Sequence, residues 1–111
     1  MTTSAEIVSD SRFKRSHQLL SKSWSVANQV DTDEVRDRVR LAFHGLERVD
    51  ADPGLAEMRL REVRRHLTVA SNRSTTDDVR VPVRNAIQLV DGLLEETPVE
   101  SSRAVVEEGS R

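Results

Sequence analysis

The residues best suited to chemistry in this chain are its three histidines and its arginines, because the chain has no cysteine. The lack of thiols excludes disulfides, zinc–thiolate sites and cysteine nucleophiles. Basic residues are concentrated between positions 59 and 66, where guanidinium groups could bind phosphate, either as an anion or in nucleic acid. The residues of this possible nucleic-acid or anion face are Arg61, Arg64, Arg65 and His66, alongside Arg59.

Two properties of the chain weigh against nucleic acid as a partner. The formal net charge is −2, so no overall positive field attracts a polyanion. Segment 59–66 also lacks an aromatic side chain on which a base could stack. We favour the alternative, in which these arginines pair with carboxylates of neighbouring helices and otherwise face water.

Two of the histidines follow an arginine in the pattern Arg-x4-His, namely Arg12 with His17 and Arg61 with His66. This pattern resembles the short motif of HEPN-type ribonucleases, whose domains are helical bundles and are usually dimeric. The resemblance implies that the Arg and His would lie at a shared cleft and cleave RNA. In that family a polar residue usually follows the arginine, whereas Phe13 and Glu62 stand there in this chain.

The other polar residues form no recognisable catalytic or metal-binding arrangement. No glycine-rich phosphate loop, paired carboxylates or Ser-His-Asp pattern is present. We expect His17 at the edge of the core, with a role as ligand or general base as the alternative, and His44 and His66 at the surface. The serines of the first helix are expected on its surface. We therefore predict no catalytic residue, no metal and no cofactor.

Apolar residues recur at alternating steps of four and three in four segments, which is the pattern of helices that bury one face. This predicts an all-α fold, an antiparallel up-down four-helix bundle over residues 9–96. Trp24 is expected in its core. The predicted core positions are Phe13, His17, Leu20, Trp24 and Ala27; Val35, Val39, Ala42, Leu46 and Val49; Ala56, Leu60, Val63, Leu67 and Ala70; and Val79, Val83, Ala86, Val90 and Leu93.

Capping residues predict where these helices begin. Asp31 is expected to cap the second helix together with Glu34, and Asp52 to cap the third with Pro53 in its first turn. Residues 72–76 close the third helix and offer caps for the fourth. Pro82 predicts either that the fourth helix starts near Val81 or that it is kinked there.

The second and fourth helices begin with similar sequences, 32–42 and 76–86, which share Thr, Asp, Val, Arg and Ala in register. Residues 25–28 and 68–72 also match, with one extra residue in the second copy. We infer two similar helical hairpins. The alternative is that any two amphipathic helices rich in these residues look alike.

The first and third helices are basic, and the second and fourth are acidic, so lateral neighbours in a bundle have opposite sign. Several apolar residues lie beside the main stripes, which favours either tighter burial or a partner surface. A self-associating chain and a well-packed monomer both fit this pattern. The residues of the possible partner surface are Leu19, Val26, Met58 and Val69, with Leu41 and Leu55.

The two ends, residues 1–8 and 97–111, lack a sustained stripe and are expected to be flexible. The N-terminal sequence does not resemble a secretory signal, and no apolar run approaches the roughly 20 residues of a membrane span. We expect a soluble, cytoplasmic protein that does not insert into membranes. The predicted function is a non-enzymatic interaction or structural module that binds another protein or itself. The alternative is a nucleic-acid-associated protein or a HEPN-like ribonuclease.

Overall fold

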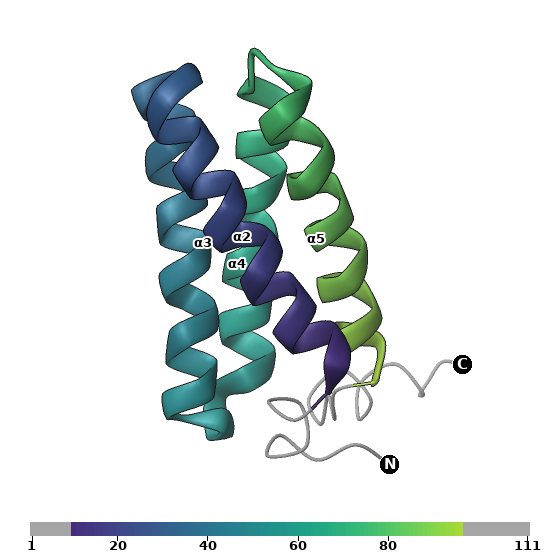
Figure 1. The fold of residues 1–111 in the computed structure, drawn as a ribbon. Coiled ribbons are helices and arrows are strands. Elements are labelled where there is room, and N and C mark those ends of the chain that lie inside the picture. Colours follow the sequence, from purple (N-terminus) through teal and green to yellow (C-terminus); the bar gives the residue numbers. More distant parts are fainter. Residues whose placement is uncertain (1–9, 97–111) are drawn as a thin grey trace, which may run out of the picture.

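Four long helices make up the computed structural model, which describes residues 10–96 (Figure 1). They are α2 (Ser11–Val30), α3 (Asp33–Ala51), α4 (Ala56–Arg73) and α5 (Asp77–Glu96), with a 3-10 turn, η1 (Pro53–Leu55), before α4. The prediction of an all-α four-helix fold is confirmed. The segments predicted to be flexible, 1–8 and 97–111, lie outside the described residues. Within residues 10–96, no helix combines the length and the apolar character needed to cross a membrane.

The helices stand at the four corners of a bundle, and the chain reverses direction at each connection (Figure 1). Both α2 and α4 pack against α3 and α5, so α2 and α4 occupy opposite corners. Contacts between α3 and α4 follow an antiparallel order. The start of α3 meets the end of α4 where Arg73 Nη1 lies 3.2 Å from Glu34 Oε1, and further along Gly45 approaches Val63.

Three of the four helices bury the stripes expected from the sequence. The predicted core residues of α3, α4 and α5 are each at most 1% exposed. Most of these side chains are valine or alanine, which lets neighbouring backbones approach closely. A Cβ atom placed on Gly45 would lie 2.6 Å from Val63 Cγ2, so α3 and α4 are in close contact at that level.

The prediction that Asp31 caps the second helix is wrong. Thr32 takes this place, because its Oγ1 accepts a hydrogen bond from the backbone N–H of Val35 at 3.3 Å. The Asp31 carboxylate instead accepts from Ser74 Oγ at 2.6 Å and from the Thr75 N–H at 3.2 Å. Asp31 therefore ties the α2–α3 connection to the α4–α5 connection, which the local sequence did not indicate.

The starts of α4 and α5 also differ from the prediction. Asp52 does not cap α4; its Oδ1 accepts from the N–H of Gly54 at 3.3 Å, and the 3-10 turn precedes the helix. Helix α5 begins at Asp77 and contains Pro82, so a start near Val81 is wrong. Pro82 has no N–H to donate, which leaves one early carbonyl without its helical partner.

The two hairpins are similar in their caps and core positions. Thr32 precedes α3, and Thr76 precedes α5, where its Oγ1 accepts from the N–H of Asp78 at 3.2 Å. The connection before α5 is one residue longer than that before α3. Equivalent side chains are buried in both copies, namely Val35 and Val79, Val39 and Val83, and Ala42 and Ala86.

Candidate functional site

Helix α2 buries only three of the five side chains that its sequence pattern predicts, namely Phe13, Leu20 and Ala27. The buried residues are Phe13, Ser16, Leu20, Ser23 and Ala27. Trp24, which was expected in the core, is only half-buried, and so is His17, which was expected at the edge of the core. Ser16 and Ser23, expected on the surface, are 0% exposed. The serine hydroxyls donate to carbonyls of their own helix, Arg12 and Leu19, both at 2.8 Å. Their burial therefore leaves no unpaired donor in the core.

The hairpin repeat shows how unusual this arrangement is. The matching sequences align His17 with Leu60 and Trp24 with Leu67. Helix α4 buries both leucines completely. Because an indole has about 150–250 Å² of mainly apolar surface to bury, a helix with only a structural role gains stability by turning it inward. Helix α2 instead leaves both rings half-buried, with Trp24 packed against the edge of the core.

His17 and Trp24 of α2 meet Phe43 and His44 of α3, and these four residues form what we call the aromatic face. The ring centroids of His17 and Phe43 lie 4.6 Å apart, and those of Trp24 and Phe43 lie 5.5 Å apart. His44 adds edge contacts to Trp24 and to Phe43, both at 5.8 Å. These are ordinary separations for tilted and edge-to-face rings. Two of the chain's three aromatic residues thus lie half-exposed on one side of the bundle.

The carboxylate of Glu47, one turn further along α3, lies close to both histidines of this face. Its Oε1 lies 3.0 Å from His44 Nδ1, and its Oε2 lies 3.9 Å from His17 Nε2. The side chains of His17, His44 and Glu47 are 39%, 45% and 49% exposed, so water reaches all three. Within residues 10–96, no group of three or more histidine and acidic side chains is placed to hold a metal ion.

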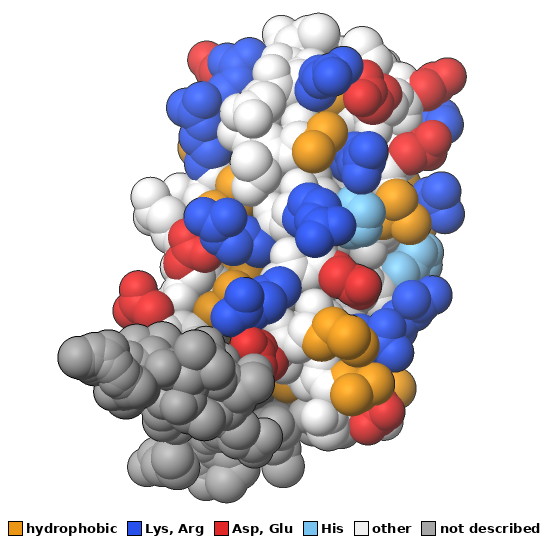
Figure 2. All heavy atoms as spheres, turned by 180° about the vertical axis from the view of Figure 1, so that it is seen from behind, with side chains coloured by type: hydrophobic (Ala, Val, Ile, Leu, Met, Phe, Trp, Pro, Cys, Tyr) orange, Lys and Arg blue, Asp and Glu red, His pale blue; other side chains and the backbone are white. Residues whose placement is uncertain are grey.

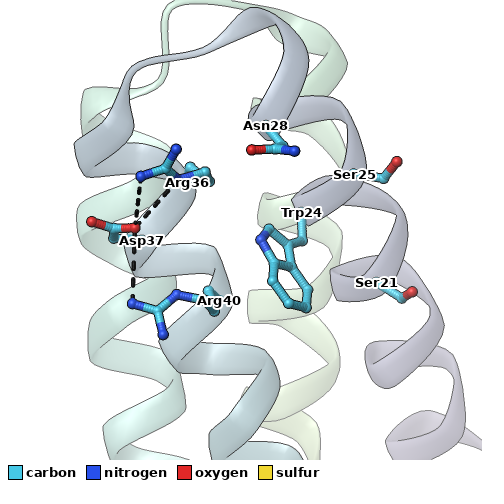
Figure 3. A pocket seen from close by; sticks show the side chains of 7 residues that line it. All are labelled: Ser21, Trp24, Ser25, Asn28, Arg36, Asp37 and Arg40. Atoms are coloured by element: carbon cyan, nitrogen blue, oxygen red, sulfur yellow. Dashed lines mark hydrogen bonds and ion pairs between the residues drawn. The ribbon is translucent and has the colours of Figure 1, made fainter.

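Above the aromatic face, a hollow of about 600 Å³ opens between α2 and α3 (Figure 3). Trp24 and Asn28 point from α2 toward α3, whereas the hydroxyls of two serines on α2 point away. Asp37 Oδ1 lies 3.2 Å from Arg36 Nη2 and 3.8 Å from Arg40 Nη2. This upper hollow is lined by Ser21, Trp24, Ser25, Asn28, Arg36, Asp37 and Arg40.

Below the aromatic face, a second hollow of about 540 Å³ lies between the same two helices. It is lined by Phe13, Lys14, His17, Gln18, Glu47 and Asp50. Two carboxylates and one lysine line this lower hollow, whereas two arginines and one carboxylate line the upper one. The upper hollow, the aromatic face and the lower hollow together form what we call the groove, which runs between α2 and α3. The groove is apolar and aromatic in the middle, positive at one end and negative at the other.

The residues of the possible nucleic-acid or anion face point to different neighbours. Arg61 Nη2 pairs with Glu57 within α4 at 2.9 Å, and Arg64 pairs with Asp91 of α5. Arg65 is exposed and makes no ion pair with the part of the chain that the structure describes. On the face opposite α2, basic side chains alternate with acidic ones (Figure 2).

His66 faces α3 and is neutral in its contact there. Arg38 Nη1 lies 3.1 Å from His66 Nδ1, and because a guanidinium only donates, Nδ1 is the acceptor. Burial and the positive charge of Arg38 hold the pKa of His66 below its ordinary value of 6.5, against an opposing effect of Glu62. His66 is thus part of the α3–α4 contact.

The structure separates the members of each Arg-x4-His pattern. Arg12 Nη2 pairs with Asp10 at 2.8 Å and lies beside Gly92 of α5, whereas His17 contacts α3. Arg61 pairs within α4, and His66 turns to α3. Among residues 10–96, the lower hollow is lined by His17 but not by Arg12, and a hollow between α4 and α5 is lined by Arg61 but not by His66. A HEPN-like activity stays a prediction.

The residues of the possible partner surface also lie on different parts of the bundle. Leu19 and Val26 of α2 are half-buried and pack against the core. Met58 of α4 is 49% exposed, and Val69 lines a hollow between α4 and α5. Because α2 and α4 occupy opposite corners, these four residues do not form one patch. Sequence reasoning missed the aromatic face, although the serines seven residues apart in α2 were a signal for it.

Comparison with known proteins adds no family to this description. No family model, no curated protein and no solved structure matches this chain. The function is therefore argued from the surface of the bundle itself.

Proposed function

We propose that this chain is a non-enzymatic interaction module that binds a protein through the aromatic face and the two hollows beside it. The observation that carries the proposal is the position of Trp24. Its counterpart in the repeat, Leu67, is fully buried, while Trp24 and His17 remain half-exposed over buried serines. An exposed indole is costly for an isolated bundle and becomes favourable when a partner covers it.

The chemistry of this surface suits a protein better than a nucleic acid. Protein interfaces are enriched in aromatic side chains and arginine at their centre and are bordered by polar groups. The groove has that composition, with rings between charged ends of both signs. Nucleic acid requires a surplus of positive charge, and most of the α4 arginines discussed above already have partners. The cytoplasmic location expected from the sequence stays a prediction.

Site-specific photo-crosslinking in the living source cell tests this proposal. A benzophenone amino acid placed at Gln18 or Asn28, which line the two hollows and are exposed, should give discrete crosslinked products. The matched controls are Asn72 of α4 and Gln88 of α5, which are exposed on other parts of the bundle. Mass spectrometry then identifies the partner, which can be another protein or a copy of this chain.

The products should appear at the two groove positions and disappear when Trp24 and Phe43 are both replaced by serine in a chain that keeps its helical circular dichroism. Equal products at all four positions, or none at any, would exclude the groove as a binding surface.

A further inference from the structure

The charges of the groove are arranged symmetrically about one level of the bundle. Arg40 and Glu47 of α3 both face the groove, and the midpoint between them falls between Phe43 and His44. Arg36 and Asp50 lie further out in the same groove, and their midpoint falls at Phe43. Among these four residues of α3, each positive one therefore has a negative one at a similar distance on the other side of this level. Asp37 of the upper hollow and Lys14 of the lower hollow lie outside this pairing.

The rings of α2 follow the same symmetry. His17 and Trp24 both contact Phe43, one from below and one from above, with centroid distances of 4.6 and 5.5 Å. The level midway between them along α2 is therefore close to the level of Phe43 on α3. One level thus divides the groove into halves that are alike in their rings and opposite in the charges of these four α3 residues.

A surface with this pattern is complementary to itself. A two-fold axis that lies in the plane of the face, perpendicular to the helices and at the level of Phe43, would place α3 antiparallel to α3 of a second copy. Arg40 would then face Glu47 of the second copy, and Trp24 would face His17. Asp37 would stay with its own arginines, to which it is already paired.

Resting on the proposed function, we propose that the occupant of the groove is a second copy of this chain in this antiparallel arrangement. The aromatic faces pack together at the centre, and each upper hollow receives the lower end of the other copy. A second copy accounts for the shared midpoint of both charge pairs and the two rings, because each half of the face then meets the opposite half. The paired charges fix the orientation of the copies more than they add affinity.

The size of the face predicts a weak dimer. From Phe13 to Asn28 the groove runs about 22 Å at 1.5 Å per residue, and two packed helices are roughly 20 Å wide, so each copy contributes about 450 Å². The total falls below the roughly 1,200 Å² of standard interfaces. We therefore expect a dissociation constant on the order of 10–100 μM.

Sedimentation velocity of the full chain over about 1 μM to 1 mM measures this equilibrium. Arg40→Glu and Glu47→Arg each place like charges in contact twice in the symmetric dimer, so each variant should associate at least about tenfold more weakly. Arg48→Glu and Glu62→Arg are matched controls, because both residues are exposed but line neither hollow. The controls should keep the dissociation constant of the wild-type chain within about threefold.

Mixing the two groove variants is the decisive step. In a heterodimer of Arg40→Glu with Glu47→Arg, both contacts again join opposite charges. The mixture should therefore dimerise within about threefold of the wild-type chain, whereas each variant alone associates at least about tenfold more weakly. A wild-type chain that is monomeric at 1 mM or a mixture that does not recover association overturns the proposal.

The crosslinking experiment separates this failure from that of the proposed function. If the groove positions crosslink to a different protein, the second copy is excluded but the interaction module stands. If neither a copy nor another protein is captured, both proposals fail.

Discussion

Replacing Gly45 by alanine tests how closely α3 and α4 are packed. A glycine inside a helix costs about 1 kcal/mol relative to alanine, so the substitution alone should stabilise α3 by that amount. The added Cβ, however, would lie 2.6 Å from Val63 Cγ2. Ordinary carbon contacts are about 3.5–4.0 Å, so the two helices or the valine must move by roughly 1 Å. Val63 is fully buried, and a β-branched side chain in a helix has one favoured rotamer.

The clash should therefore exceed the gain in helix propensity. Overpacking of this kind costs about 1–3 kcal/mol, which leaves a net loss of roughly 0–2 kcal/mol for Gly45→Ala. Gly92→Ala is the matched control, because its added Cβ would meet only the guanidinium end of Arg12, with Nη1 at 3.2 Å. That flexible group can shift, so this variant should gain up to about 1 kcal/mol.

Urea unfolding followed by circular dichroism at 222 nm measures both free energies. We expect Gly45→Ala to be less stable than Gly92→Ala by about 1–3 kcal/mol, or roughly 5–20 °C in melting temperature. In a Val63→Ala background, Gly45→Ala should become neutral or stabilising, with a coupling energy above about 0.5 kcal/mol. Equal stabilisation by both glycine substitutions, without coupling to Val63, would refute close packing of α3 and α4.

Three further predictions concern single side chains. Because the pKa of His66 in the folded chain lies below 6.5, its contribution to stability is complete above pH 6.5 and is lost as the pH falls. When the pH is lowered from 7.5 to 5.5, the free energy of unfolding measured in urea should therefore decrease less for His66→Asn than for the wild-type chain. Burial raises the pKa of Asp31, but hydrogen bonds from Ser74, Thr32 and Thr75 outweigh it and hold the pKa below 3.8. Asp31→Asn should therefore lose about 1–2 kcal/mol at pH 7 by chemical unfolding, and its difference from the wild-type chain should shrink as the pH falls through the folded pKa. In calorimetry, Trp24→Ala should lower the free energy of unfolding by less than about 2 kcal/mol, whereas Leu67→Ala, at the equivalent buried position, should lower it by about 2–5 kcal/mol. Equal losses for the two variants would place the indole in the core.

The sequence was sufficient to predict the helices and three of the four buried stripes. In α3, α4 and α5 the apolar residues leave one choice of inward face, and burial follows it. In α2 the steps 13, 17, 20, 24, 27 and 13, 16, 20, 23, 27 both alternate between three and four. Residue hydrophobicity favours the first, but the structure adopts the second because Ser16 and Ser23 satisfy their hydroxyls within the helix.

The capping errors have a different physical origin. Asp31 and Thr32 are adjacent, and either side chain can cap a helix, so local preference does not separate them. The choice is made by Ser74, which is 43 positions further along the chain and donates to Asp31. The aromatic face was missed for a related reason, since it depends on the rotation of α2 and on its contact with Phe43.

Acrylamide quenching of the fluorescence of Trp24, the only tryptophan, tests most directly whether α2 turns this ring outward. At low micromolar concentration, where the chain is monomeric, we predict quenching intermediate between that of a free indole and that of a buried one, because Trp24 is half-buried. An indole that is shielded from acrylamide at this concentration, as a core tryptophan is, would contradict the position of α2 and the binding surface built on it.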